Sequence, residues 1–245
     1  MKLLFTLMFA VLPAAANDGK AVAQNVPVPV EIEVGNFEAD VEDTWGILRK
    51  LMGQSRAKTY IGKVTEDLRK RDLKSAQTNL DTMVKEFPEL KETQGHVIQV
   101  YQGQISFWNR DYKSAYKSFN GVVLYIERLF PKGVKPEDLD DGDRDFVAGT
   151  YFGRGATEIQ LRKYEWAVAD IDKAFALIPK AYMQLNKCRA LLQLKRFGDA
   201  AAAYELTYKM DPKTTESEDK NRICEKFAKN GLQPKPCEKS EKVVL

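Results

Sequence analysis

One short phrase occurs four times along the chain, and it constrains the fold more than any other feature. Each copy has polar residues, then an aromatic residue or leucine, two spacer residues and an alanine, with a large apolar residue four positions further on. The alanines are Ala76, Ala115, Ala167 and Ala200, and the large residues are Leu80, Phe119, Ile171 and Tyr204. A recurring supersecondary unit determines the architecture before individual residue propensities do.

The phrase predicts a helical hairpin. Apolar residues around each alanine recur at helical spacing, as in Ala115, Phe119 and Val122. Twelve residues before each alanine a second helical stretch carries Val64, Gly103, Gly155 or Cys188, three of which are small. Small residues on both helices let the backbones approach, and the large residue one turn after the alanine fills the remaining space. The second helix is expected to end at a proline, which cannot continue the hydrogen-bond ladder; these prolines are Pro88, Pro131, Pro179 and Pro212.

The pattern resembles the tetratricopeptide repeat. The third and fourth units match its consensus best, at Gly155, Tyr164, Ala167, Ile171, Ala174 and Pro179, and at Cys188, Leu191, Phe197, Ala200, Tyr204 and Pro212. Glu158, Val64 and Asp67 depart from it. The resemblance implies an all-α, right-handed solenoid of helical hairpins with about ten helices and capping helices at both ends. An ordinary bundle with alanine-rich helices is the alternative, and the 33-residue spacing of Ala167 and Ala200 argues against it.

The sequence divides around these repeats. The repeat region is predicted at 57–213, with units at 57–90, 96–131, 148–180 and 181–213 and an acidic insertion at 132–145 between the second and third units. A capping helix is expected at 37–56, and a capping helix with a tail at 214–245. One hairpin cannot bury its own apolar face, so such units stack and the terminal ones need caps.

Residues 1–16 have the features of a secretory signal. Lys2 supplies the positive start, Leu3 to Leu12 form a short apolar run, and cleavage is expected after about Ala16. The run is shorter than the ~20 residues that span a bilayer, so no membrane insertion is expected once the signal is removed. The sequence therefore predicts an exported, periplasmic protein. An uncleaved amphipathic helix and a eukaryotic secretory lumen stay open as alternatives.

Residues 17–36 carry few helix signals and are expected to be an extended or disordered leader. Val26 to Val34 alternate apolar residues with proline or glutamate. Pro27 and Pro29 exclude a central strand. The segment is either a disordered leader or an extended segment that lies in the molecule's own groove or on a partner.

The chain has three cysteines, and export makes their oxidation relevant. Cys188 stands at a small buried position, so we expect an inert core thiol. Cys224 and Cys237 bracket a turn with Gly231 and two prolines, and a disulfide between them would tie the tail to the capping helix. Their spacing lacks the Cys-x-x-Cys pattern of a redox-active pair.

Composition and motifs favour a binding protein over an enzyme. Lys plus Arg number 38 and Asp plus Glu 35, spread along the helices, which is not the pattern of a nucleic-acid binder. His96 is the only histidine, and no serine or cysteine elbow accompanies it. The acids around Gly142 do not fit an EF-hand, because Ala148 stands where the closing glutamate belongs. No catalytic residue, cofactor or metal site is predicted.

The resemblance also implies where a partner would bind, since the first helix of each hairpin lines the concave face in that family. The groove candidates are Val97, Val100, Tyr101, Gln104, Trp108, Phe152, Ala156, Tyr182, Leu185, Asn186 and Arg189. Phe107 and Ile159 are expected in the core instead. The lysine-rich carboxylate clamp of chaperone-binding relatives is missing, with Asn186 and Arg189 as isolated polar groups. An aromatic groove suits an apolar helix or an extended peptide. The alternative is that these aromatic side chains belong to the core of the solenoid.

The sequence thus predicts a periplasmic adaptor that binds a protein segment in its concave groove and supports an envelope complex. The alternatives are a self-assembling structural solenoid and a regulatory subunit of an enzyme. The partner is a protein or peptide of unknown identity, and the chain is a monomer or a homo-oligomer.

Overall fold

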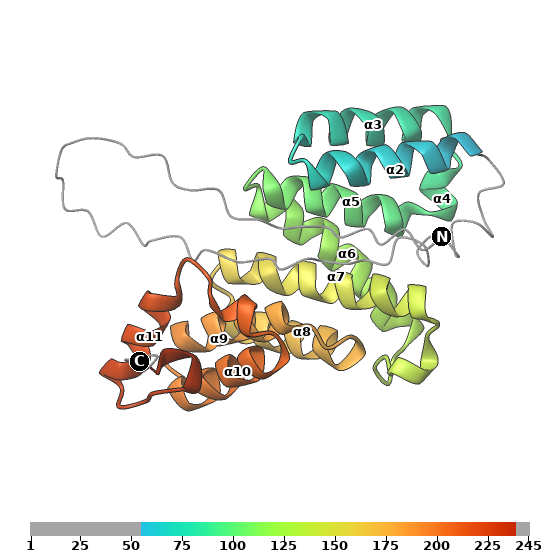
Figure 1. Ribbon diagram of the computed structural model, residues 1–245. Coiled ribbons are helices and arrows are strands. Elements are labelled where there is room, and N and C mark those ends of the chain that lie inside the picture. Colours follow the sequence, from blue (N-terminus) through green and yellow to red (C-terminus); the bar gives the residue numbers. More distant parts are fainter. Residues whose placement is uncertain (1–54, 239–245) are drawn as a thin grey trace, which may run out of the picture.

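A computed structural model describes residues 55–238, and all regular structure in that range is helical (Figure 1). The all-α prediction is confirmed there. Its ten α-helices are α2 (Ser55–Arg69), α3 (Leu73–Glu86), α4 (Leu90–Thr93), α5 (Gly95–Trp108), α6 (Tyr112–Leu129), α7 (Asp141–Gln160), α8 (Tyr164–Leu177), α9 (Ala181–Gln193), α10 (Phe197–Met210) and α11 (Lys220–Lys229). The predicted signal, the leader and the capping helix at 37–56 up to residue 54 lie outside the described residues.

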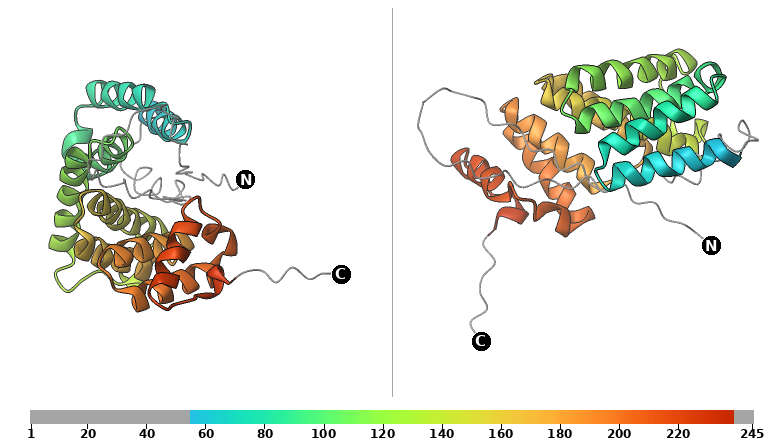
Figure 2. Two further views of the ribbon diagram at one scale, coloured as in Figure 1. Left: turned by 90° about the vertical axis from the view of Figure 1, so that its left-hand side faces the viewer. Right: turned by 90° about the horizontal axis from the view of Figure 1, so that it is seen from above.

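The helices pack in chain order. The pairs α2 with α3, α5 with α6, α7 with α8 and α9 with α10 make the most extensive contacts, and each pair packs on the next. The first helices α5, α7 and α9 also contact one another in sequence. Seen along the helices, the described part of the chain follows an arc from α2 to α11 (Figure 2).

The turn inside each pair has the same backbone conformation four times. Arg71, Arg110, Arg162 and Lys195 each have φ between 59° and 63°, the left-handed region. The residue after each of them donates its N–H to a carbonyl five residues earlier, as in Lys163 N to Glu158 O at 2.8 Å. This satisfies carbonyls that a helix C-terminus would otherwise leave unpaired. The sequence repeat is therefore also a repeat of structure.

The side chain of Phe119 shows how closely the helices approach. A Cβ added to Gly103 on α5 would lie 3.0 Å from its ring, and one added to Gly153 on α7 would lie 2.7 Å from it. Phe119 thus fills the space between two successive pairs. Ile171 lies against Gly155 in the same way, with a distance of 3.1 Å. These contacts confirm the prediction that a large residue on the second helix packs on a small one.

The acidic insertion differs from its prediction. A 3₁₀ turn (Pro136–Asp138) stands within it, and α7 begins at Asp141, seven residues before the predicted unit. Asp140 is the reason, since its carboxylate accepts the N–H of Asp143 at 2.8 Å and caps the helix. The short α4 was not predicted.

The C-terminal segment forms a cap, as expected. Helix α11 buries Ile223 and Phe227, and the Phe227 ring lies 5.9 Å from that of Tyr204 on α10. Gly231 follows with φ +71°, so the helix stops where a glycine tolerates the left-handed conformation. A disulfide joins Cys224 of α11 to Cys237, with the two Cα atoms 5.3 Å apart.

Candidate functional site

The predicted groove residues all lie on the first helices α5, α7 and α9. In the structure Val100 and Trp108 are half-buried and the other nine are buried, namely Val97, Tyr101, Gln104, Phe152, Ala156, Tyr182, Leu185, Asn186 and Arg189. The apolar members belong to or pack on one continuous core, together with Phe107 and Ile159. Leu185 is fully buried, so it contributes to packing between helices. The peptide-binding role of the remaining positions stays a prediction.

Aromatic side chains connect the successive first helices along this set. The Phe152 ring on α7 and the Tyr182 ring on α9 meet edge to face, with centroids 5.0 Å apart. The hydroxyl of Tyr101 on α5 lies 3.2 Å from that of Thr65 on α2, the first helix of the preceding pair. The set thus forms a row that runs across neighbouring helix pairs. We call the side of the molecule formed by the predicted groove residues of α5, α7 and α9 the aromatic face.

Arg189 is not the isolated polar group that the sequence suggested. Its guanidinium donates two hydrogen bonds to Asp219, of 2.6 and 3.0 Å, and both side chains are only 3% exposed. Ser217 also donates to this carboxylate at 2.8 Å. These bonds hold the pKa of Asp219 below its ordinary value against the opposing effect of burial. Arg189 therefore fastens the C-terminal cap to α9.

A second buried ionic cluster lies between α6, α7 and α8, and only a hint of it can be found in the sequence. Arg154 donates to both oxygens of Asp170, at 2.5 and 2.8 Å, and to the side-chain oxygen of Asn120 at 2.8 Å. Asp170 is 3% exposed. Glu158, one turn after Arg154, is also buried, and its Oε2 has no described hydrogen-bond partner. The hint was Glu158 itself, a carboxylate at a position where the repeat expects a large apolar residue.

The environment of Glu158 changes its ionisation. Burial, and after it the negative charge of Asp170, raise the pKa of Glu158 to about 8. At neutral pH its carboxyl group is therefore mostly protonated. Such a group is able to act as a proton donor in a cleft, but here it is enclosed among packed helices, so its effect is on stability.

His96 lies between aromatic rings rather than beside a nucleophile. Its ring stacks on Tyr125 with centroids 5.4 Å apart and meets the edge of Phe146 at 5.6 Å. Burial lowers its pKa, which favours the neutral imidazole. These contacts indicate a packing role in the corner between α5, α6 and α7.

A pocket between α8, α9 and α10 has charged groups at its rim that are already paired. It has a volume of about 310 Å³, with Val168 and Ala203 among its apolar lining. At its rim Lys187 binds Asp172 at 2.6 Å, and Arg196 binds Asp199 at 2.7 Å. Charged groups that are paired in this way offer no strong anchor for an ionic ligand.

Neither a cluster of metal ligands nor a membrane-spanning helix is found among residues 55–238. Within them no three histidine, cysteine or acidic side chains converge as ligands of a metal ion. No helix in this range combines the length and the apolar character needed to cross a bilayer. Comparison of the chain with protein-family models, curated proteins and solved structures finds no match.

Proposed function

We propose that this chain is an exported adaptor of the tetratricopeptide-repeat type, in which the helix pairs form a right-handed solenoid and the aromatic face binds a segment of another protein. The observation that carries the proposal is the fourfold recurrence of one turn and one packing arrangement. A stacked array of that kind places equivalent side chains of successive first helices in a row. Such a row suits a ligand that is itself an extended chain or a helix.

The chemistry of the row favours an apolar segment. Trp108 and Val100 are the half-buried apolar members of the row, and the buried rings of Tyr101, Phe152 and Tyr182 lie behind them. Aromatic residues such as Trp108 are frequent binding hot spots. The charge of Arg189 is engaged by Asp219, so it is not available as a carboxylate clamp. Binding of this kind would support the assembly or stability of an envelope complex, with the predicted signal placing the adaptor in the periplasm.

Site-specific photo-crosslinking in the native host tests the proposal. A photoreactive residue in place of Trp108, which is half-buried on the aromatic face, is expected to capture one defined protein segment. The matched control carries it in place of Leu124, which is 50% exposed on α6. A synthetic peptide of the captured segment is then titrated against the wild type and against a variant with Tyr101→Ala and Trp108→Ala.

We expect at least a tenfold loss of peptide affinity in the double variant, provided that its circular dichroism and melting temperature show a folded protein. Equal affinity of a folded double variant would remove the aromatic face as the binding site. Equal capture from position 124 would show that the crosslinking is unspecific.

A further inference from the structure

The four turns inside the helix pairs gather positive charge at one edge of the molecule. All four lie at the same ends of the helices, at the left in Figure 1. The windows 69–74, 108–113, 160–165 and 193–198 hold ten basic and three acidic residues. The basic residues are Arg69, Lys70, Arg71, Lys74, Arg110, Lys113, Arg162, Lys163, Lys195 and Arg196, which we call the basic edge.

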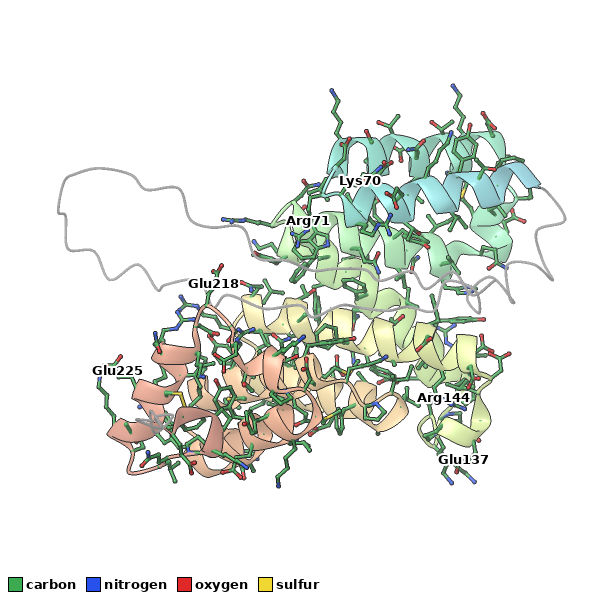
Figure 3. All side chains as sticks on the ribbon, in the orientation of Figure 1. Lys70, Arg71, Glu137, Arg144, Glu218 and Glu225 are labelled. Atoms are coloured by element: carbon green, nitrogen blue, oxygen red, sulfur yellow. A yellow bond between two sulfur atoms is a disulfide. The ribbon has the colours of Figure 1, made fainter. Side chains whose placement is uncertain are left out.

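The rest of the chain does not share this excess. Residues 136–145 hold six acids and one arginine, and Figure 3 shows Glu137 and Arg144 on the side away from Lys70 and Arg71. Residues 216–229 carry four basic and four acidic residues, so the C-terminal cap adds no net charge to either side. The sequence analysis expected charges spread over the helices. The structure collects them because four distant segments make the same turn at the same edge.

The charges of the basic edge are accessible. Eight of the ten side chains are exposed, and Arg71 and Lys163 are half-buried. Ion pairs are described for Arg69, Lys70 and Arg196, but none among the described residues for Arg110, Arg162 or Lys195. Helix dipoles add little here, because at each turn one helix ends where the next begins. Two of the three acids, Asp72 and Asp111, are occupied as helix caps.

An exposed aromatic residue stands within the same edge. Trp166 in the first turn of α8 is 57% exposed, more than any other large hydrophobic side chain among residues 55–238. The ammonium of Lys163 lies 4.7 Å from its ring centroid and 4.0 Å from that of Tyr116. Tryptophan and tyrosine beside lysine form the combination that proteins place at the boundary between water and lipid headgroups.

We propose that the basic edge docks this protein on an anionic lipid bilayer, with Trp166 reaching into the headgroup layer. A row of four turns matches an extended charged surface better than a single ligand. Each lysine or arginine near an anionic bilayer strengthens binding by about fivefold. The opposite, acidic side would face away from the lipid. The basic edge meets the aromatic face where the Arg71 guanidinium lies 3.6 Å from the centroid of the Trp108 ring. The docking argument uses no residue of the aromatic face, so it does not depend on the proposed function.

Vesicle co-sedimentation of the full chain tests this docking, with vesicles of phosphatidylglycerol and phosphatidylcholine at low salt. The test variant is Arg110→Gln, Lys113→Gln, Arg162→Gln and Lys195→Gln. The matched control neutralises four exposed basic residues outside the basic edge, namely Lys85→Gln, Lys91→Gln, Arg128→Gln and Lys132→Gln. All three proteins keep the same apolar N-terminal residues, so any binding by those residues is common to them.

We expect the test variant to lose at least about tenfold in vesicle affinity and the control less than about twofold. Binding of the wild type is expected to weaken as salt rises. Equal losses of vesicle affinity in the test variant and the control would show that only the net charge matters. That result would overturn the basic edge as the docking surface. Equal binding to pure phosphatidylcholine, or wild-type binding to a single-stranded oligonucleotide at least as tight as to the anionic vesicles, would overturn the lipid assignment.

Fluorescence supplies a second measurement on the same vesicles. The emission lost in a Trp166→Phe variant belongs to Trp166, and we expect this component to be shielded from aqueous acrylamide when anionic vesicles are added. Unchanged quenching of that component would contradict the placement of Trp166 in the headgroup layer.

Discussion

At the scale of single residues, the packing around Phe119 makes the clearest prediction. Gly153→Ala would place a methyl group 2.7 Å from the Phe119 ring, closer than packed atoms allow. We expect a loss of about 1–3 kcal/mol in the free energy of unfolding, although alanine favours helices by about 1 kcal/mol. Urea unfolding followed by circular dichroism measures the change.

Gly62 on α2 supplies the control, because nothing lies within 4 Å of a Cβ added there. Gly62→Ala is expected to stabilise the protein by about 0.5–1 kcal/mol. In a double variant, Phe119→Leu puts a smaller side chain opposite the new methyl group of Gly153→Ala. This variant should therefore recover part of the stability lost in Gly153→Ala alone. A stabilising Gly153→Ala would show that the two helix pairs are not held in contact through Phe119.

Glu158 makes stability depend on pH in a defined direction. Its pKa is raised to about 8 in the folded protein, whereas an unfolded glutamate titrates near 4.5. Between these values the folded state binds more protons, so stability falls as pH rises, and below pH 4.5 the effect vanishes. Glu158→Gln mimics the protonated carboxyl. We expect it to raise the free energy of unfolding on the order of 4–5 kcal/mol at pH 9 and to change it little at pH 4.5.

Melting curves of wild type and variant across this pH range measure the difference. The control is Glu165→Gln, because Glu165 is exposed on α8 and Glu158 is intact in that variant, whose stability should follow pH as that of the wild type does. A parallel pH dependence of wild type and Glu158→Gln would mean that another group is responsible.

At the scale of elements, the C-terminal cap is held by a disulfide within it and by the ion pair of Arg189 and Asp219, which joins it to α9. The disulfide from Cys224 to Cys237 closes a loop of 14 residues, and such a loop stabilises by about 3 kcal/mol in the chain-entropy account. We expect a Cys224→Ser and Cys237→Ser variant to lose up to this amount and to exchange the amide hydrogens of α11 faster. Hydrogen exchange of α2 and α3 in the same sample is the internal control. Unchanged exchange in α11 would show that the ion pair of Arg189 and Asp219 is sufficient to hold the cap.

The sequence predicted the four helix pairs well, but it predicted the segment between the second and third pairs and the contacts of the C-terminal cap less well. Alanine, glycine and proline positions act locally through backbone approach and helix termination, so they can be recognised in one dimension. The acids before the third unit were expected to favour the N-terminus of its first helix, but the start of α7 was placed seven residues too late because several of them could have capped it and the structure selects Asp140. The partner of Arg189 was missed because Asp219 lies thirty residues away and meets it only after the cap has folded back.

At the scale of the whole molecule, contacts connect each helix pair mainly with its neighbours in sequence. Stability in such an array is a sum of local terms, so damage at one end should not spread far. Leu80→Ala in α3 is expected to cost about 3 kcal/mol locally. Cys188 on α9 is fully buried, and burial raises the pKa of its thiol, so a thiol reagent labels it only slowly. Leu80→Ala should not change the rate of this labelling.

Leu191→Ala, beside Cys188 on α9, is the matched control and is expected to speed the labelling. Both variants remove a fully buried leucine, so the comparison isolates distance along the array. Equal acceleration by both would indicate that residues 55–238 unfold as one cooperative unit.

The sequence alone determined the helical class, the four units and the cap, because spacing of small, large and helix-ending residues expresses local geometry. It also indicated Cys224 and Cys237 as a pair, since the turn between them brings their backbones together. Only the tertiary structure decided which charges meet. It buried Glu158 beside Asp170, engaged Arg189 with Asp219, and brought the basic turns of four distant segments to one edge. Coulomb interactions and burial depend on distances in space, and a sequence with nearly balanced charge does not contain those distances.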